Sequence, residues 1–304
     1  MSTRITTGMV IGSTLADINA AQLAMTRTQG ELSSGKSILE PSDNPYGASQ
    51  AIALQSSLDG LGSYERSAKD GISWLNTSAS ALTSIDSQVQ RVRELVLQAG
   101  NGIDSPSDLA NIAAEVEQLT EGVKQDVNTQ YAGQYVFSGT LTNTPAYQPG
   151  ENDTYQGNAG TVSRVIGPGA PANISVNLAS VFGNGPGAAD GKLLDTLRTI
   201  VTNLKEGTPA AVETLRTTDL KNLDTNLNAL TGVQAEAGAV TDQLDLALSR
   251  IQSLQITATQ QLSNVQDANI AQVSIEFSNQ QAAFNAALRA GASIVQESLL
   301  EFLH

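Results

Sequence analysis

The chain has 304 residues, of which 40% are hydrophobic and only 4% aromatic, and its formal charge is -14. Its 16 lysines and arginines are scattered singly, which argues against nucleic-acid binding and against attachment to an anionic membrane surface. Cysteine is absent, which excludes disulfides and thiolate metal sites. No run of 18 apolar residues and no secretory signal occur, so we expect neither a membrane span nor a cleaved leader.

The first predicted helix covers residues 10–33 and ends at Ser33-Ser34-Gly35. Residues 1–40 carry no net charge, so this segment can pack against another helix without repulsion. One stripe recurs at spacings of four and three, namely Ile11, Leu15, Ile18, Gln22, Met25, Gln29 and Leu32. The two glutamines suit a seam whose register is set by polar residues.

A loop leads to a second helix, predicted over 46–99, with Asp43 or Asn44 as its cap and Pro45 in its first turn. Gly60, Gly62 and Gly71 weaken its first half, where we expect a kink. Such a helix is about 80 Å long, whereas a compact globule of this chain length is about 50 Å across. The sequence therefore predicts an elongated rod of antiparallel helices. A third helix is predicted from about 105 to 131.

Between 133 and 209 the pattern changes, since this stretch holds twelve of the 26 glycines and six of the nine prolines. Strands are predicted at 134–138, 162–166 and 173–178, with a short helix at 190–205. We interpret this stretch as a small β-rich insert.

Helical periodicity returns from 210 to 290, and the C-terminal stripe contains Ile270, Val273, Phe277, Phe284 and Leu288. The predicted fold class is mainly α with a small β-rich insert, with paired N- and C-terminal helices. The predicted divisions are 1–40 (N-terminal assembly helix), 41–132 (first half of the helical rod), 133–209 (β-rich outer domain), 210–267 (second half of the rod) and 268–304 (C-terminal assembly helix).

Residue patterns give little support for catalysis. The single histidine, His304, stands at the end of the sequence, so a Ser-His-Asp triad or a zinc-binding His pair is not expected. The Gly183–Gly187 stretch lacks the lysine of a phosphate loop, and Glu151-Asn152-Asp153 lacks the spacing of a calcium loop. Trp74 is interpreted as a core anchor. We predict no catalytic residue, no cofactor and no metal.

Several motifs resemble the flagellin superfamily. They are Leu32-Ser33-Ser34-Gly35-Lys36, Pro41-Ser42-Asp43-Asn44-Pro45 and Ala48–Ile52 near the start, Tyr135–Thr140 with Pro145-Ala146-Tyr147 in the insert, and Gln280–Phe284 with Ser298–Leu303 at the end. The Pro-Ser-Asp-Asn-Pro form is similar to that of hook-filament junction proteins. Arg91–Leu95 and Ala99–Gly102 are also similar to filament flagellin, so self-polymerising flagellin is the alternative.

The resemblance implies a structural, extracellular flagellar protein, exported through the type III apparatus without a cleaved signal peptide. Implied partners are copies of itself in a ring-like layer, a neighbouring hook-associated protein, filament flagellin, and an export chaperone on the C-terminal segment. The resemblance favours packing of the terminal stripes between chains over packing within one monomer. The candidate assembly interface consists of Ile11, Leu15, Ile18, Gln22, Met25, Leu32, Ile270, Val273, Phe277, Phe284, Leu288, Leu299, Leu300, Phe302 and Leu303.

Overall fold

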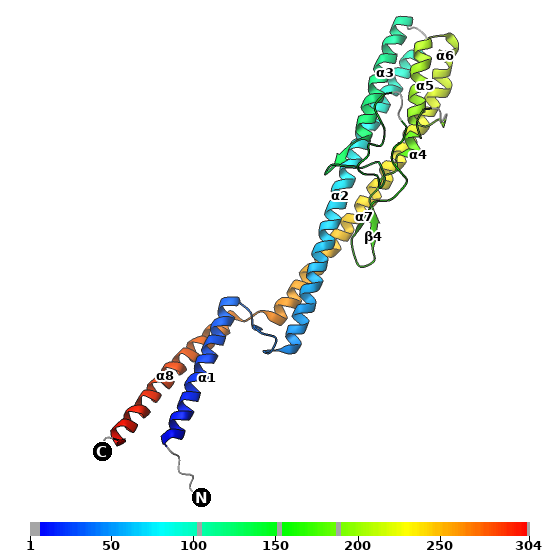
Figure 1. The fold of residues 1–304 in the computed structure, drawn as a ribbon. Helices are drawn as coiled ribbons and strands as arrows, with labels where there is room; N and C mark the ends of the chain where they lie inside the picture. The colour runs from blue at the N-terminus through cyan, green and yellow to red at the C-terminus, as the bar shows by residue number, and fades with distance from the viewer. Residues whose placement is uncertain (1–6, 102–104, 151–153, 187–189, 303–304) are drawn as a thin grey trace. The chain divides into compact units, whose positions relative to one another are not determined.

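The computed structural model describes residues 7–101, 105–150, 154–186 and 190–302 (Figure 1). The chain forms two compact units. The terminal unit comprises Met1–Gly60 and Leu254–His304, and the central unit comprises Leu61–Ser253. Two long helices, α2 (Pro45–Gly100) and α7 (Leu220–Gln266), contribute residues to both units.

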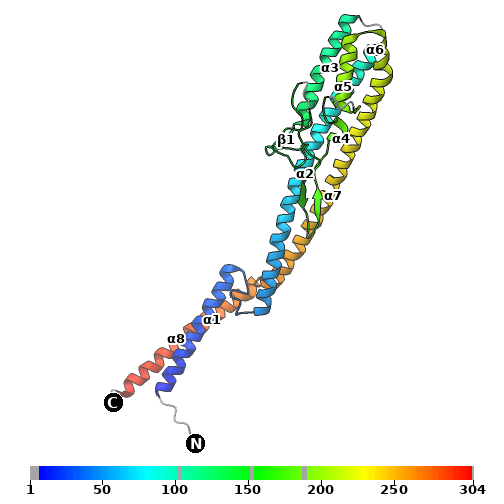
Figure 2. The ribbon, with the colours of Figure 1, turned by 45° about the vertical axis from the view of Figure 1, so that its right-hand side comes forward.

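The terminal unit is built around α1 (Thr7–Ser34) and α8 (Ile270–Phe302). These helices lie side by side in Figures 1 and 2 and pack against each other. They run antiparallel, because Gly291 near the end of α8 lies against Thr14 and Ile18 near the start of α1. The predicted pairing of the N- and C-terminal helices is therefore confirmed.

The central unit adds α3 (Pro106–Val127), α4 (Ala179–Phe182), α5 (Leu193–Glu206) and α6 (Pro209–Thr214), with a π-helical segment at Leu215–Asp219 before α7. Helix α3 packs against α5, as Figure 2 shows. Ser105 and Asp108 form a capping box at the start of α3, which satisfies two backbone amides there. The helix predicted at 190–205 is confirmed as α5.

One hydrophobic core holds the central unit together. Trp74, at 0% exposure, is its largest fully buried side chain, so its interpretation as a core anchor is confirmed. Across the unit, Arg93 Nε donates to Asp224 Oδ1 at 2.6 Å, and Gln234 Nε2 donates to the Leu82 carbonyl at 3.1 Å. These bonds join the α2 and α7 segments of this unit.

The strands are shorter than the sequence predicts. They are β1 (Gln130–Tyr131) paired with β2 (Gln134–Tyr135), and β3 (Ser163–Val165) paired with β4 (Pro171–Asn173), both antiparallel.

The predictions of strands at 134–138 and 173–178 are wrong over most of their length, and 162–166 is reduced to β3. Val136 and Phe137 are buried in the core instead of continuing β2. After β4, the Asn173 side chain accepts from the Ser175 amide at 3.0 Å, a local turn that competes with strand pairing.

Asp70 anchors the insert to α2. Its carboxylate accepts from Arg164 Nε at 2.6 Å and from the Tyr131 hydroxyl at 3.2 Å. Tyr131 also meets Trp74 edge-on, with ring centroids 6.0 Å apart, and the Arg164 guanidinium lies 6.0 Å from the Trp74 ring centroid. The β-containing segment is thus attached to α2 at one mixed polar and aromatic cluster.

Candidate assembly site at the terminal helix pair

The contact between α1 and α8 follows one narrow seam on each helix. Its members are buried or half-buried and recur at spacings of four and three, as Thr14, Ile18, Ala21, Met25, Thr28 and Leu32 on α1, and Val273, Phe277, Gln280, Phe284, Ala287 and Gly291 on α8. This spacing keeps each row on the side that faces the partner helix. On α1 the seam alternates small and large residues, and on α8 it ends in the small residues Ala287 and Gly291, which allows close packing of the two helices.

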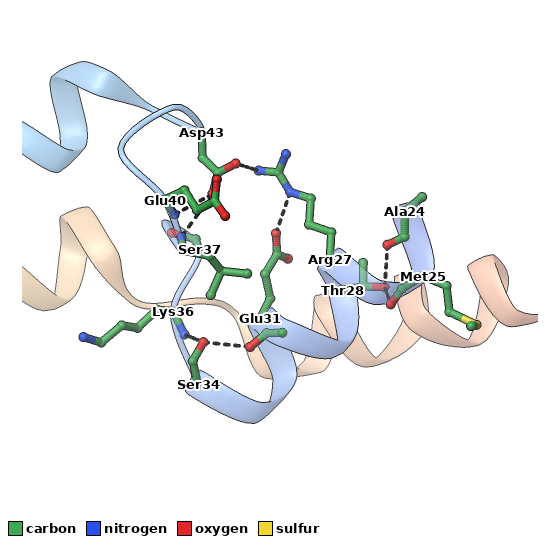
Figure 3. Close-up of polar contacts among 12 residues, drawn as sticks. Ala24, Met25, Arg27, Thr28, Glu31, Ser34, Lys36, Ser37, Glu40 and Asp43 are labelled. Atoms are coloured by element: carbon green, nitrogen blue, oxygen red, sulfur yellow. Dashed lines mark hydrogen bonds and ion pairs between the residues drawn. The ribbon is translucent and has the colours of Figure 1, made fainter. Parts of the chain in front are cut away.

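Two seam positions show how closely the helices approach. A Cβ atom added at Gly291 would lie 3.0 Å from Ile18 Cδ1 and 3.4 Å from Thr14 Cγ2. Thr28 is buried, and its hydroxyl donates back to the carbonyls of Ala24 and Met25 at 3.1 and 3.0 Å (Figure 3). The polar group at Thr28 is therefore satisfied within its own helix and does not oppose packing.

The segment between α1 and α2 is fastened by Asp43 (Figure 3). Its Oδ2 accepts from the backbone amides of Leu39 and Glu40 at 3.1 and 3.0 Å, and its Oδ1 lies 3.4 Å from the Arg27 guanidinium. Arg27 also pairs with Glu31 at 3.2 Å. The pKa of Asp43 is held below its ordinary value, first by the hydrogen bond from the Glu40 amide and then by the Leu39 amide and the Arg27 charge. Desolvation of the carboxylate acts in the opposite direction.

Asn44 caps α2, as the sequence predicts, because its Oδ1 accepts from the Gly47 amide at 2.9 Å. Side chains of the same connection fill spaces left by glycines. A Cβ at Gly30 would lie 2.8 Å from Leu39 Cδ1, and one at Gly47 would lie 2.8 Å from Ile38 Cδ1. The connection is therefore an ordered, closely packed element.

Exposed apolar side chains are concentrated in the terminal unit. Eleven of the fifteen large apolar side chains described as exposed belong to it, namely Met9, Leu15, Leu23, Leu39, Tyr46, Ile52, Leu254, Ile256, Ile270, Ile275 and Leu288. Among its described residues, the buried apolar ones are Ala48, Ala51, Ala258 and Val273. The terminal unit thus has many apolar groups but very little core of its own.

The candidate interface residues divide between these two environments. Ile18, Met25, Leu32, Val273, Phe277 and Phe284 lie on the seam, whereas Leu15, Gln22, Ile270 and Leu288 are exposed. Ile11, Leu299, Leu300 and Phe302 lie within α1 and α8, but their side chains are outside the described part of the structure, as is the whole of Leu303.

Sequence reasoning missed part of the seam. Thr14, Ala21 and Thr28 on α1, and Ala287 and Gly291 on α8, are small or polar residues that a search for large apolar side chains passes over. The signal that could have identified them is the alternation of small residues with Ile18, Met25 and Leu32 at the same spacing. Arg27 was missed because an ion pair to a distant loop leaves no local pattern.

The described residues show no arrangement typical of metal binding or membrane insertion. No group of three histidine, aspartate or glutamate side chains among them is close enough to hold a metal ion. None of the helices, as far as the structure describes them, combines the length and hydropathy required to cross a bilayer.

Comparison with known proteins finds similarity to bacterial flagellins. Residues 2–142 match the model of the bacterial flagellin N-terminal helical region. Flagellin of Bacillus subtilis (strain 168) is 28% identical over 285 residues, which cover 90% of each chain. The chain is therefore similar to bacterial flagellins, both in its N-terminal region and over most of its length. Phase 1 flagellin of Salmonella naestved is 38% identical over 138 residues, but the match covers 45% of this chain and 27% of that relative.

Solved structures with the same fold include a flagellar hook-associated protein and a flagellar junction protein. A putative flagellar hook-associated protein from Vibrio parahaemolyticus aligns with a TM-score of 0.66 at 18% identity, over 74% of this chain and 100% of that one. The flagellar junction protein FlgL from Legionella pneumophila aligns with a TM-score of 0.59 at 15% identity, over 71% and 99%. The predicted mainly helical, flagellin-like fold is confirmed.

Proposed function

We propose that this protein is a structural component of the bacterial flagellum that forms the junction between hook and filament. Its terminal helices act by coiled-coil packing against copies of the same chain. Similarity to the flagellin N-terminal helical region and the fold shared with hook-associated proteins support this role.

The observation that carries the proposal is the exposed apolar surface of the terminal unit. Ordering the backbone of one residue costs about 1–2 kcal/mol, whereas burying one large apolar side chain returns about 1.5–3 kcal/mol. With Val273 as its one large buried apolar residue among those described, the isolated unit gains little from burial. Neighbouring copies that cover Leu15, Leu23 and Ile275 would supply the missing burial.

The proposal includes partners and a location. Copies of the chain form a ring-like layer, with a hook-associated protein on one side and filament flagellin on the other. Before assembly, an export chaperone holds the C-terminal segment. The final location is the extracellular flagellum, reached without a cleaved signal peptide. We expect no enzymatic activity, because the functional surface we infer is an interface between helices.

Deletion of residues 1–33 or 268–304 tests the proposal. We expect either deletion to abolish incorporation onto hooks isolated from the producing bacterium, measured by co-sedimentation and electron microscopy. Trp74 is the only tryptophan and is fully buried in the central unit, so its fluorescence reports whether that unit stays folded. Incorporation of the deleted chains at the full-length level would contradict the proposal.

The second candidate is filament flagellin. The 28% identity to Bacillus subtilis flagellin over 90% of both chains favours it. A filament protein added to hooks extends into long fibres as its concentration increases, whereas a junction protein stops after a short layer. Electron microscopy of hooks incubated with excess purified chain distinguishes the two. Growth of long fibres would reject the junction and support flagellin.

A further inference from the structure

The side of the terminal helix pair next to the seam carries a second regular strip on each helix. On α1 it consists of Gly12, Leu15, Asn19, Gln22, Thr26, Gln29 and Ser33, and on α8 of Ala271, Ser274, Ser278, Gln281, Asn285, Leu288 and Ala292. Both strips recur at alternating spacings of three and four, so each follows one side of its helix. All fourteen residues are exposed and none is charged.

The two strips lie on the same side of the pair. On α1 the strip follows the seam by one residue, as Leu15 follows Thr14. On α8 it does the same, as Ser274 follows Val273. A two-fold axis perpendicular to the plane of an antiparallel pair relates the two helices, so equivalent positions share a side. The fourteen residues therefore form one continuous surface, which we call the uncharged face.

Most of the charged residues described on the two helices lie on the opposite side. The other edge of the seam carries Asp17, Arg27 and Glu31 on α1, each one residue before a seam position. Glu276 has the equivalent position on α8. Arg27 is already paired with Glu31 and with Asp43. Apart from Arg289, which is exposed on the outer surface of α8 beside the strip, charge is thus segregated to one side of the helix pair. Solvation of a monomer alone does not require this segregation.

From this segregation we propose that the uncharged face docks the terminal helices of a second copy of the chain. Two copies, each with a formal charge of -14, repel one another over most of their surfaces, and here they can meet without opposing charges. Asn and Gln amides are both donors and acceptors, so a strip rich in them is complementary to itself. Leu15 and Leu288, at 61% and 43% exposure, add apolar contact.

This inference rests on the proposed function and specifies which surface of the terminal unit joins copies. A strongly charged partner would find no opposite charge on this face. The same face would remain wetted if the terminal pair contacted other copies only through its outer positions, such as Leu23 and Ile275. Docking through the uncharged face therefore predicts that this face is covered on assembly, which assembly in general does not predict.

Adding one negative charge to this face tests the inference. Gln22→Glu and Gln281→Glu change shape very little and retain good helix propensity. In full-length protein we expect each to raise the concentration for half-maximal incorporation onto isolated hooks at least tenfold. Raising the salt concentration to 0.5 M should recover part of the loss, because salt screens exposed charges. Circular dichroism should show unchanged helix content.

Asn279→Asp is the matched control, because Asn279 is exposed on the charged side of α8, three residues after Glu276. It adds the same charge to the same helix pair, and we expect less than a twofold change. A nitroxide attached to Gln22→Cys should lose mobility on assembly, whereas one on Asn279→Cys should stay mobile. The absence of native cysteine makes this labelling specific.

The outcomes separate the inference from the function on which it rests. Normal incorporation of Gln22→Glu and Gln281→Glu, with loss on deletion of residues 1–33, overturns the docking face and leaves the junction function standing. Equal impairment by Asn279→Asp also overturns the face. Failure of the full-length, unaltered chain to incorporate overturns both. Binding of an export chaperone that depends on Gln22, with incorporation unaffected, assigns the face to another partner.

Discussion

The backbone amide of Ser37 donates to the carbonyl of Gln266 across 2.7 Å and so joins the segment before α2 to the end of α7. The Ala268 amide donates to the Gly35 carbonyl at 2.9 Å in the same place, where Lys36 and Asp267 form an isolated antiparallel bridge. The segment that follows α1 and the segment that precedes α8 therefore lie side by side and are hydrogen-bonded to each other. Two backbone hydrogen bonds thus join the two connecting segments next to the helix pair.

Replacing Asp43 tests what orders the segment between α1 and α2. Asp43→Ala removes the acceptor for the Leu39 and Glu40 amides and the partner of Arg27, so we expect both amides to lose hydrogen-exchange protection. Because folding lowers the pKa of Asp43, its contribution is present above the ordinary aspartate pKa and is lost as pH falls through the folded value.

Protection factors corrected for intrinsic exchange, measured in steps from pH 6 to pH 3, check both expectations. Ser42→Ala, at the exposed neighbouring position, should retain protection of both amides. Undiminished protection in Asp43→Ala would show that the packing of Ile38 and Leu39 alone orders the segment.

Enlarging Gly291 tests the seam. Gly291→Val places a branched side chain against Ile18 and Thr14, where even a Cβ has only 3.0 and 3.4 Å. Overpacking of this kind costs about 1–3 kcal/mol, so α1 and α8 should separate more easily. Hydrogen exchange of α1 amides in the full-length monomer measures the change.

The control for the seam is Ala290→Val, which introduces the same side chain at an exposed neighbouring position of α8. By helix propensity alone it is the less favourable of the two changes, because valine is a poorer helix former than alanine but a better one than glycine. Similar loss of α1 protection in both variants would mean that a branched side chain on α8 acts without the contact with Ile18.

Neutralising Asp219 should stabilise the central unit at neutral pH. Asp219 is 1% exposed in the π-helical segment, and burial raises its pKa although Asn203 Nδ2 donates to its Oδ2 at 2.6 Å. Its contribution is favourable below the ordinary aspartate pKa and is lost as pH rises through the folded value. Asp219→Asn should therefore raise the free energy of unfolding at pH 7 by about 0.5–2 kcal/mol.

Urea unfolding followed by Trp74 fluorescence at pH 7 and at pH 4 measures this difference. The gain should shrink at pH 4, which is near the ordinary aspartate pKa, so that part of the unfolded Asp219 is also protonated. Asp245→Asn, at an exposed position on α7, should change stability by less than about 0.5 kcal/mol. A destabilised Asp219→Asn at pH 7 would reveal a partner that requires the charge.

The sequence by itself determined the helical fold, the paired ends and the flagellin resemblance, because these depend on local periodicity and on motifs. It could not decide which edge of the α1 stripe faces α8. The large residues Ile18, Met25 and Leu32 fit two adjacent rows, one completed by Leu15 and Gln22 and the other by Thr14, Ala21 and Thr28. Only the shape of the partner helix, with Gly291 against Ile18 and Thr14, selects the second row.

Only the tertiary structure shows how the insert is packed and how the connecting segments are bonded. The Val136–Phe137 pair has strand-like residues, yet the free energy gained by burying both in the central core exceeds what extending a two-residue strand would give. The bond from Ser37 to Gln266 joins residues 229 positions apart in the sequence, which local pattern cannot predict. Charge and periodicity can be read from the chain, but the side that a helix turns toward its partner is fixed only by packing.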